Sequence, residues 1–330
     1  MLRLGLDIGG TKIEAQLLDS QGVSLQCKRI ATPTTGYGDF LAAITDLVNE
    51  IRQELDGTFT IGIGLPGAIS PQTGRIKNAN CLFLNGQDLK GDLTRVLGQP
   101  VWLANDADCF TLSEAVDGAG DAGRLVFGII LGTGCGGGLV VNRQLIVGPN
   151  AITGEWGHNP LPGYDPAQDG PSQPCYCGRH NCIERFISGT GFAGRFVERH
   201  GRSLSPRGII TAAAEGDHQA LAHYGHFIQA LARSVASLIN VLDPDVIVLG
   251  GGLSNIDLLY RDLPRALDPY LFSDGCITPI VPARHGDSSG VRGAAWLPSC
   301  AEGIATWAPA QGGYRPQCAI AVAPDCRCRP

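Results

Sequence analysis

The feature of this sequence that most limits its fold is a repeat of two glycine-tipped hairpins. The segments "GLDIGGTKIEAQLLDSQG", which starts at Gly5, and "GIILGTGCGGGLVVNRQL", which starts at Gly128, both read as strand, glycine-rich turn and strand. Gly9 and Gly132 follow these starting glycines at one constant offset. Two similar halves of this kind predict a pair of α/β domains that face one cleft.

The rest of the chain alternates between helical and strand-like patterns. Apolar residues recur at helical spacing from Phe40 to Leu55 and from Leu221 to Leu242. The runs "TIGIGLPG" and "VIVLGGG" read as buried strands that end in glycine turns. At 330 residues the chain is long enough for two domains with cores of ordinary size. The fold class expected from these patterns is therefore α/β.

Composition and charge narrow the classes of function. The net charge is −6 and Lys and Arg form no cluster, so we expect no nucleic acid partner. No apolar run approaches the roughly 18 to 20 residues that a membrane span requires. The first residues, "MLRLGLDIGG", lack the basic region and apolar stretch of a secretory signal, so we expect a cytoplasmic protein. There, the 12 cysteines are expected to be reduced thiols or metal ligands rather than disulfides.

Three of the cysteines form a compact cluster in "CYCGRHNC". Cys175, Cys177 and Cys182 lie within eight residues, and His158 stands 17 residues upstream of the first. Three thiolates and one imidazole are a ligand set for tetrahedral Zn²⁺, and four protein ligands leave no open position for substrate. The cluster therefore predicts a structural zinc site, with His180 as a rival fourth ligand and reduced structural thiols as the alternative.

The glycine-rich tips of the two hairpins are candidates for binding phosphate. Exposed backbone N–H groups at such tips can hold phosphate oxygens, because glycine has no side chain to keep the ligand away. Neither tip fits the G-x-x-x-x-G-K-[ST] motif, and the first lacks the G-x-G-x-x-G spacing. One such tip alone often supplies only a tight turn. Two tips in the same register favour a shared phosphate site.

A polar pair follows the apolar run "VWLA". Asn105 and Asp106 come where a strand is expected to end, and ligand sites of α/β proteins gather at such strand ends. The same pair is also typical of a helix cap, which is the structural alternative. Asp108 is a rival carboxylate in the same segment.

Seven motifs occur in the order in which the ROK family of sugar kinases and repressors carries them. They are "LGLDIGGTK", "LPGAIS", "LANDADC", "ILGTGCGGG", "GEWGHNPL", "CYCGRHNCIERFISG" and "VIVLGGGLS". The resemblance covers about residues 2 to 297 and implies the family's actin-like ATPase fold of two ribonuclease-H-like domains. Within the family, "KNANCLFLNG" and "RHGDSSGVRGAAW" look most similar to the bacterial fructokinases that are also called manno(fructo)kinases.

The resemblance implies a sugar kinase that uses ATP and Mg²⁺. The expected reaction is phosphorylation of D-fructose on its 6-hydroxyl, with mannose as a slower substrate; a glucokinase or N-acetylglucosamine kinase is the alternative. ROK repressors carry a helix-turn-helix segment ahead of "DIGGTK", and only six residues precede Asp7, so a DNA-binding role is not expected. An actin-like structural ATPase would leave the cysteine cluster unexplained. The expected partners are the sugar, ATP and a second copy of the chain in a homodimer.

The resemblance also assigns roles to individual residues. Asp106 is expected to be the catalytic base that takes the proton of the sugar hydroxyl, and Asp7 is expected to position Mg²⁺ through water. The expected sugar contacts are Gly67, Asn80, Asn105, Asp106, Glu155, His158 and Glu184. The expected contacts to ATP are Gly5, Asp7, Gly9, Gly10, Thr11, Lys12, Gly132, Thr133, Gly134, Cys135, Gly136, Gly250, Gly251 and Gly252.

The family's zinc pattern, H…C-x-C-G-x-x-G-C, supports the metal site. It matches at His158, Cys175, Cys177 and Cys182. Asn181 replaces the second glycine, which is tolerable because Asn enters the left-handed region more readily than other non-glycine residues. Glu155 and Glu184 flank the pattern, so the zinc would draw both carboxylates toward one sugar pocket.

The expected domain division falls near residue 118. Residues 1–118 form an N-terminal α/β domain that is completed by about 286–297, and residues 119–285 form a C-terminal α/β domain with the zinc loop 155–184. Residues 298–330 are atypically rich in Cys and Pro and lie beyond the resemblance. No function follows from them, and a disordered tail and the product of a shifted reading frame are the two interpretations.

Overall fold

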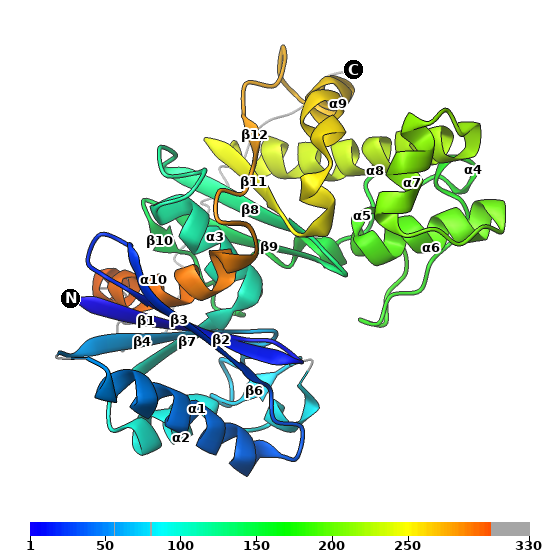
Figure 1. Cartoon of the computed structure of the whole chain (residues 1–330). Coiled ribbons are helices and arrows are strands. Elements are labelled where there is room, and N and C mark those ends of the chain that lie inside the picture. The colour runs from blue at the N-terminus through cyan, green and yellow to red at the C-terminus, as the bar shows by residue number, and fades with distance from the viewer. Residues whose placement is uncertain (56, 80, 305–330) are drawn as a thin grey trace, which may run out of the picture.

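The computed structural model describes residues 1–55, 57–79 and 81–304 and contains two five-stranded sheets of the same topology (Figure 1). The first sheet has the order β3-β2-β1-β4-β7, and the second has the order β10-β9-β8-β11-β12. In each sheet an antiparallel hairpin leads into strands that run parallel to its first strand. The internal repeat and the α/β fold class predicted from the sequence are therefore confirmed.

The strands are short and their bounds follow the alternating apolar segments. The first sheet comprises β1 (Leu2–Ile8), β2 (Lys12–Leu18), β3 (Ser24–Ala31), β4 (Phe59–Leu65) and β7 (Val101–Asn105). The second comprises β8 (Leu125–Leu131), β9 (Cys135–Val141), β10 (Gln144–Leu145), β11 (Val246–Gly250) and β12 (Ile280–Pro282). A small separate hairpin comprises β5 (Ala68–Ile69) and β6 (Ile76–Lys77).

The helices differ widely in length. The α-helices are α1 (Tyr37–Gln53), α2 (Leu89–Leu97), α3 (Asp106–Val116), α4 (Pro166–Asp169), α5 (Glu184–Ile187), α6 (Gly189–His200), α7 (Pro206–Ala214), α8 (His218–Leu242), α9 (Asp257–Leu267) and α10 (Ser289–Ile304). The 3₁₀ turns are η1 (Leu82–Leu84), η2 (Glu155–His158), η3 (Gly252–Asn255), η4 (Asp268–Tyr270) and η5 (Gly286–Ser288).

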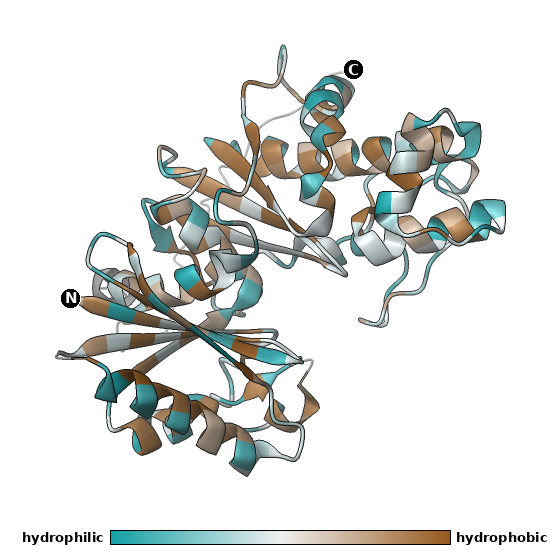
Figure 2. Ribbon diagram, viewed as in Figure 1, coloured by the Kyte–Doolittle hydropathy of each residue, from teal (hydrophilic) through white to brown (hydrophobic). Residues whose placement is uncertain are grey.

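The two glycine-rich tips project from equivalent positions of the two sheets. The first hairpin closes at the pair Ile8 and Ile13, and the second closes at Leu131 and Cys135. Helices cover both faces of each sheet (Figure 1). The outer face of the first sheet packs on α1 and α2, and the outer face of the second packs on α8 and α9. Apolar residues on these faces form the cores, as the brown strands and helix faces in Figure 2 show.

Helices α3 and α10 fill the space between the sheets. A Cβ on Gly5 would stand 2.0 Å from the carbonyl oxygen of Val291, so α10 lies directly on the first sheet. A Cβ on Gly128 would stand 2.1 Å from Thr111 Oγ1, so α3 lies equally close to the second sheet. The two helices touch each other through backbone, since a Cβ on Gly293 would stand 1.6 Å from the carbonyl oxygen of Cys109. The layer order is therefore sheet, α10, α3, sheet.

The chain passes between the halves next to α3 and α10. It enters α3 from β7 at Asn105, and it reaches α10 through the segment 283–288. Glu114 on α3 is fully buried and accepts hydrogen bonds from the backbone N–H groups of Arg284 and His285 and from the hydroxyl of Ser289. One carboxylate thus ties α3 to the second passage.

The packing of α3 and α10 can be compared with the predicted domain division, although the division itself stays a prediction. Helix α10 packs on the first sheet, in line with the expected return of residues 286–297, whereas α3 packs on the second sheet although it falls within 1–118. Helix α10 continues to Ile304, so the beginning of the segment 298–330 is helical. Residues 305–330 lie outside the described residues.

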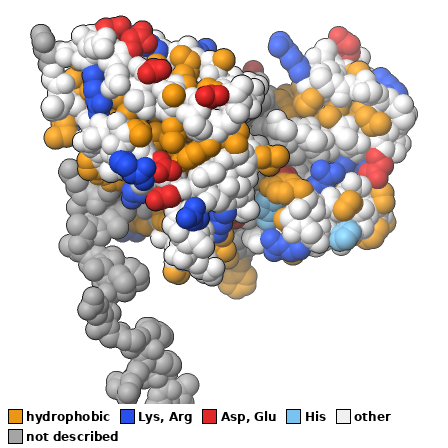
Figure 3. All heavy atoms as spheres, turned by 90° about the horizontal axis from the view of Figure 1, so that it is seen from below, with side chains coloured by type: hydrophobic (Ala, Val, Ile, Leu, Met, Phe, Trp, Pro, Cys, Tyr) orange, Lys and Arg blue, Asp and Glu red, His pale blue; other side chains and the backbone are white. Residues whose placement is uncertain are grey.

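The distribution of charge on one face and the length and polarity of the helices can be described directly. Acidic and basic side chains are scattered over the face in Figure 3 rather than gathered in one stripe. Among the described residues, every helix is too short or too polar to cross a membrane. The described cysteines are all free thiols.

Candidate active site and zinc centre

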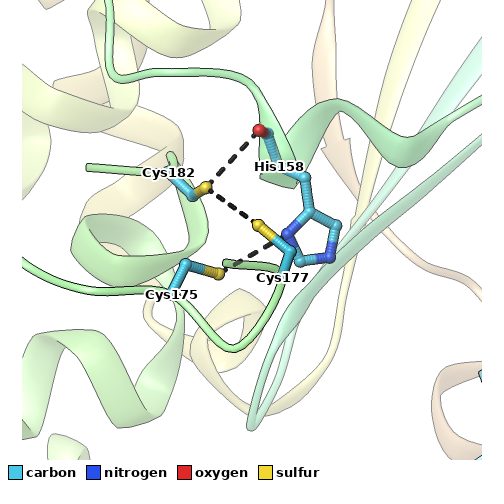
Figure 4. A group of neighbouring side chains, drawn as sticks. All are labelled: His158, Cys175, Cys177 and Cys182. Atoms are coloured by element: carbon cyan, nitrogen blue, oxygen red, sulfur yellow. Dashed lines mark hydrogen bonds between the residues drawn. The ribbon is translucent and has the colours of Figure 1, made fainter. Parts of the chain in front are cut away.

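The four predicted zinc ligands lie together, with their side chains pointing toward one another (Figure 4). Their ligand atoms all lie within 4.8 Å of one another. The Sγ atoms of Cys177 and Cys182 are 3.6 Å apart, and Nδ1 of His158 is 3.7 Å from Sγ of Cys175. A tetrahedral Zn²⁺ with Zn–S bonds of about 2.3 Å requires S–S separations of about 3.8 Å. Both the donor set and its spacing therefore fit zinc.

Local backbone structure brings the cysteines to η2. Two isolated β-bridges, Pro160 with Cys182 and Pro174 with His180, hold the cysteine loop in place. Asn181 has a φ of 56°, the left-handed conformation expected for a residue that replaces glycine. Within the described chain, the group of candidate ligand atoms does not include the imidazole of His180, the rival ligand.

His158 presents its two ring nitrogens to different neighbours. Nδ1 faces Cys175, whereas Nε2 lies 2.9 Å from Oη of Tyr176 and 4.0 Å from the Glu155 carboxylate. With Nδ1 on a metal, Nε2 carries the proton and can donate it to an oxygen. Sequence reasoning missed Tyr176, because a tyrosine between two cysteines matches no ligand or catalytic pattern.

Glu184, at the start of α5, reaches the second glycine tip. Its Oε2 atom accepts a 3.0 Å hydrogen bond from the backbone N–H of Cys135. The same oxygen lies 2.6 Å from the position of the Cβ that Gly134 lacks. The zinc loop is therefore connected directly to the tip that was predicted to bind phosphate. Because Gly134 has no side chain, the carboxylate of Glu184 can approach the backbone of this tip.

Asn105 ends β7 and caps the N-terminus of α3. Its Oδ1 atom accepts a 2.9 Å hydrogen bond from the backbone N–H of Ala107, which caps the helix. Its Nδ2 atom donates to the carbonyl of Gly67 at 3.1 Å and so fixes the β4–β5 turn. Gly67 packs against Ala79, while the predicted sugar contact Asn80 lies outside the described residues.

Asp7 and Asp106 are neighbouring carboxylates between the two halves. Burial, and secondly the charge of Asp106, raise the pKa of Asp7 to about 6. Burial also raises the pKa of Asp106; the charge of Glu155 adds to this rise and the N–H of Ala107 opposes it. A raised pKa makes Asp106 a stronger base. The repulsion between the two carboxylates would be relieved by a cation such as Mg²⁺.

Several predicted ATP contacts leave the backbone open to a ligand. A Cβ on Gly10, at the first tip, or on Gly252, after β11, would meet nothing within 4 Å. Thr11, Lys12 and Thr133 are exposed beside the tips. Gly251 has a φ of 81° and packs against the end of β8. These positions leave room for phosphates at the tips and for a larger group beside β11.

Hydrogen bonds fix the shape of both tips. At the first, the N–H of Gly9 donates to the carbonyl of Lys12 at 2.9 Å, and the hydroxyl of Thr32 donates to the carbonyl of Gly9 at 2.7 Å. At the second, the N–H of Gly189 donates to the carbonyl of Gly132 at 2.7 Å, which joins this tip to the start of α6.

Three other predicted ATP contacts face helices. The missing Cβ atoms of Gly5, Gly136 and Gly250 point at α10 or α3; for Gly250 the nearest ring atom of Phe110 would be only 2.4 Å away. The absence of a side chain at these positions serves close helix packing. We therefore leave Gly5, Gly136 and Gly250 out of the proposed nucleotide site.

A largely apolar pocket of about 230 Å³ adjoins Asn105 and Glu155. Its other lining residues are Leu65, Ala68, Ile69, Trp102, Leu103, Ala104, Asp108, Leu145, Ile146, Val147, Ala151, Thr153, Leu297 and Cys300. Burial, and then the charges of Glu155 and Asp106, raise the pKa of Asp108 to about 8. Its Oδ1 atom is buried and has no hydrogen-bond partner in the described part of the chain. Asp108 therefore belongs to this pocket, and Asp106, two residues earlier, does not line it.

Comparison with known proteins decides the family. The sequence model of the ROK family matches residues 3–300. The chain belongs to the ROK family. It is 41% identical to the N-acetyl-D-glucosamine kinase of Haemophilus influenzae over 300 residues, which cover 89% of this chain and 98% of that protein. It is 42% identical to the N-acetyl-D-glucosamine kinase of Shigella flexneri over 297 residues, with 98% of that protein covered.

Solved structures of other ROK proteins share the fold of this ROK sugar kinase. The ROK hexokinase of Thermus thermophilus matches with a TM-score of 0.79 at 28% identity, over 90% of this chain and 97% of that chain. The ROK glucokinase of Streptomyces griseus, in complex with glucose and AMPPNP, matches with a TM-score of 0.71 at 27% identity, over 90% and 99%. The expected closeness to fructokinases is not confirmed, because the relatives reported above act on N-acetyl-D-glucosamine.

Proposed function

We propose that this ROK protein transfers the γ-phosphoryl group of ATP to the 6-hydroxyl of N-acetyl-D-glucosamine. The observation that carries the choice of sugar is the identity of 41% to 42% with kinases named for this sugar, over nearly their whole length. This alternative replaces D-fructose as the favoured substrate. The motifs that suggested fructose are short and lie outside the apolar pocket.

The apolar pocket beside Asn105 and Glu155 supports an acylated amino sugar. An acetamido group carries a methyl group, and burying an apolar carbon of this kind contributes roughly 0.8 kcal/mol. Fructose, glucose and mannose would offer the same wall only hydroxyl groups, whose burial without a partner costs free energy. Asn105 and Glu155 at the rim would accept or donate hydrogen bonds to the ring, while the pocket takes the acyl group.

In the proposed mechanism Asp106 takes the proton of the 6-hydroxyl. Its partly buried carboxylate has a raised pKa, and the cap hydrogen bond of Asn105 fixes the helix end on which it sits. Glu155, His158 and Glu184 orient the sugar. When bound, ATP would supply the phosphoryl group, and Mg²⁺ would neutralise the negative charge that develops during its transfer.

The remaining groups of the site bind rather than react. Asp7 would hold Mg²⁺ through water, and the open backbone at Gly10 and Gly252 would admit the phosphates and the adenosine. The zinc, held by three thiolates and one imidazole, would be structural and would keep Glu155 and Glu184 in place. The homodimer and the cytoplasmic location stay predictions.

A substrate comparison tests this function. Rates of ADP release are measured over the same range of concentrations of N-acetylglucosamine, glucose, fructose and mannose, with ATP and Mg²⁺ in excess. We expect the highest kcat/KM for N-acetylglucosamine. If kcat/KM were highest for fructose, fructose would again be the favoured substrate. If kcat/KM were highest for glucose, the chain would be a glucokinase. Ile146→Asp, which places a charge in the pocket wall, should lower kcat/KM for N-acetylglucosamine more than for glucose.

A further inference from the structure

A second pocket lies among the helices next to the zinc loop and shares no residue with the candidate active site. It has a volume of about 20 Å³. Arg195 and Arg199 line it from α6, His223 and His226 line it from α8, and Asp169 lines it from α4. Aromatic rings from α5, α6 and α8 complete the walls. The pocket therefore places two guanidinium groups in an apolar surrounding.

The guanidinium of Arg195 is buried without an acceptor. The residue is only 6% exposed, and its Nη1 and Nη2 atoms have no hydrogen-bond partner in the part of the chain that the structure describes. Glu198 approaches Nη1 no closer than 3.8 Å, and both of its carboxylate oxygens accept hydrogen bonds from Nε2 of Gln173. The guanidinium stacks over the ring of Phe186 at 4.5 Å instead. A buried charge with unmet donors costs several kcal/mol or more unless a partner is present.

The single acidic group that lines the pocket is already paired. Asp169 is 4% exposed; its Oδ1 atom accepts from Arg233 at 2.5 Å, and its Oδ2 atom accepts from the backbone N–H of Asp165 at 2.9 Å. Arg199 donates one bond, to the carbonyl of Gln168. The pocket therefore keeps an excess of positive charge. Burial, and secondly the charge of Arg199, lower the pKa of Arg195.

The two imidazoles supply no negative charge, although the unprotonated Nδ1 of His223 is an acceptor that lacks a donor among the described residues. Nε2 of His223 lies 2.8 Å from the carbonyl of Phe192 and donates to it, which leaves Nδ1 buried and unpartnered among the described residues. Burial lowers the pKa of His223 to about 4 and lowers that of His226. Both rings are therefore neutral near pH 7.

We propose that this pocket binds one small inorganic anion of the size of chloride, held by the guanidinium of Arg195 with Arg199 beside it. Its volume is slightly more than the 10–15 Å³ that one water-sized guest needs, so a monatomic ion fits and a tetrahedral oxyanion does not. A water molecule could accept from Arg195 and donate to Nδ1 of His223, so water is the rival occupant. The anion would also brace the part of the zinc loop that precedes the cysteines, because Nη2 of Arg195 lies 2.7 Å from the Cβ position that Gly170 lacks.

Two measurements test the anion site without using enzyme activity. Crystals of the full chain are soaked in sodium bromide, and anomalous scattering at the bromine edge locates the halide; we expect a peak beside Arg195. Thermal unfolding is then followed as chloride replaces gluconate at constant ionic strength. If chloride reaches about tenfold its Kd, Tm should rise by about 2–3 °C.

A pair of arginine variants separates binding from general salt effects. Arg195→Met keeps the apolar stem and removes the charge, so it should lose the chloride response. Arg202→Met, whose side chain is half-exposed and pairs with Asp217, should keep it. No bromine peak in the pocket, or an equal chloride response in Arg195→Met, would overturn the proposal and leave only water there. If Arg195→Met does not fold, the bromine peak in the parent protein decides alone.

Discussion

Replacing Asp106 by Asn separates the proposed catalytic role of this residue from its place in the fold. The amide keeps an Oδ1 atom that can accept from the N–H of Ala107, and the helix cap belongs to Asn105, so the fold and sugar binding should persist. The amide cannot take the proton of the 6-hydroxyl. We expect kcat and kcat/KM to fall together by about 10²–10⁴, the usual contribution of a general base.

Asp108→Asn is the matched control for this prediction. With a pKa of about 8, the Asp108 side chain is a neutral acid in roughly nine of ten molecules at pH 7, and an amide resembles that form. Its kcat should stay within about threefold of the parent. Both variants are assayed by coupled ADP release, and sugar binding is measured by calorimetry. If Asp106→Asn keeps its turnover while Asp108→Asn loses a hundredfold, the assignment of the base is wrong and Asp108 takes its place.

Three further predictions concern stability, zinc and nucleotide. The folded state keeps a proton on Asp108 that the unfolded state releases, so the free energy of unfolding should fall as pH rises from about 4 to about 8. Urea titrations at pH 5 and pH 8 should show a smaller fall for Asp108→Asn; an equal fall refutes this origin. Elemental analysis should show that Cys177→Ser has lost its bound zinc, and the sugar KM of this variant should rise more than its ATP KM. Cys27→Ser lies outside the cluster and should keep about one zinc per chain. Gly10→Val should raise the ATP KM, because the methyl groups of valine would cover the open backbone amide at the first tip. Calorimetry without nucleotide should show unchanged sugar binding. A parallel loss of ATP binding and sugar binding would point to misfolding.

The sequence was sufficient for features that depend on local spacing. The repeat around Gly9 and Gly132 predicted two equivalent hairpins, because period-two alternation and a glycine tip are properties of a few consecutive residues. The spacing of the cysteine loop predicted the zinc ligands for the same reason. Helix α8 begins at His218, ahead of the apolar residues at which it was expected to start, because Asp217 caps the backbone N–H groups of Gln219 and Ala220.

Features that depend on distant segments were missed. The apolar pocket is built by Trp102, Ile146 and Leu297, which come from separate elements and share no motif. The preferred sugar was therefore inferred from short motifs that do not form this wall. The sequence also cannot distinguish a glycine that faces a ligand from one that lies under a helix, which is why Gly5 was assigned to ATP rather than to the packing of α10.

The backbone contact between α3 and α10 places the two carboxylates close to the line along which the two halves meet. Gly293 and Cys109 touch through backbone, and buried side chains of the two helices form one shared core on either side of this contact. Asp106 begins one of these helices, and Gly290 of the other lies against the carboxylate of Asp7. Displacement in a rotation grows with distance from the axis, so a rotation about this contact would move the outer helices of the second half more than the two carboxylates. The proposed base would therefore stay near the axis of such a rotation, and the proposed sugar contacts of the zinc loop would move with the second half.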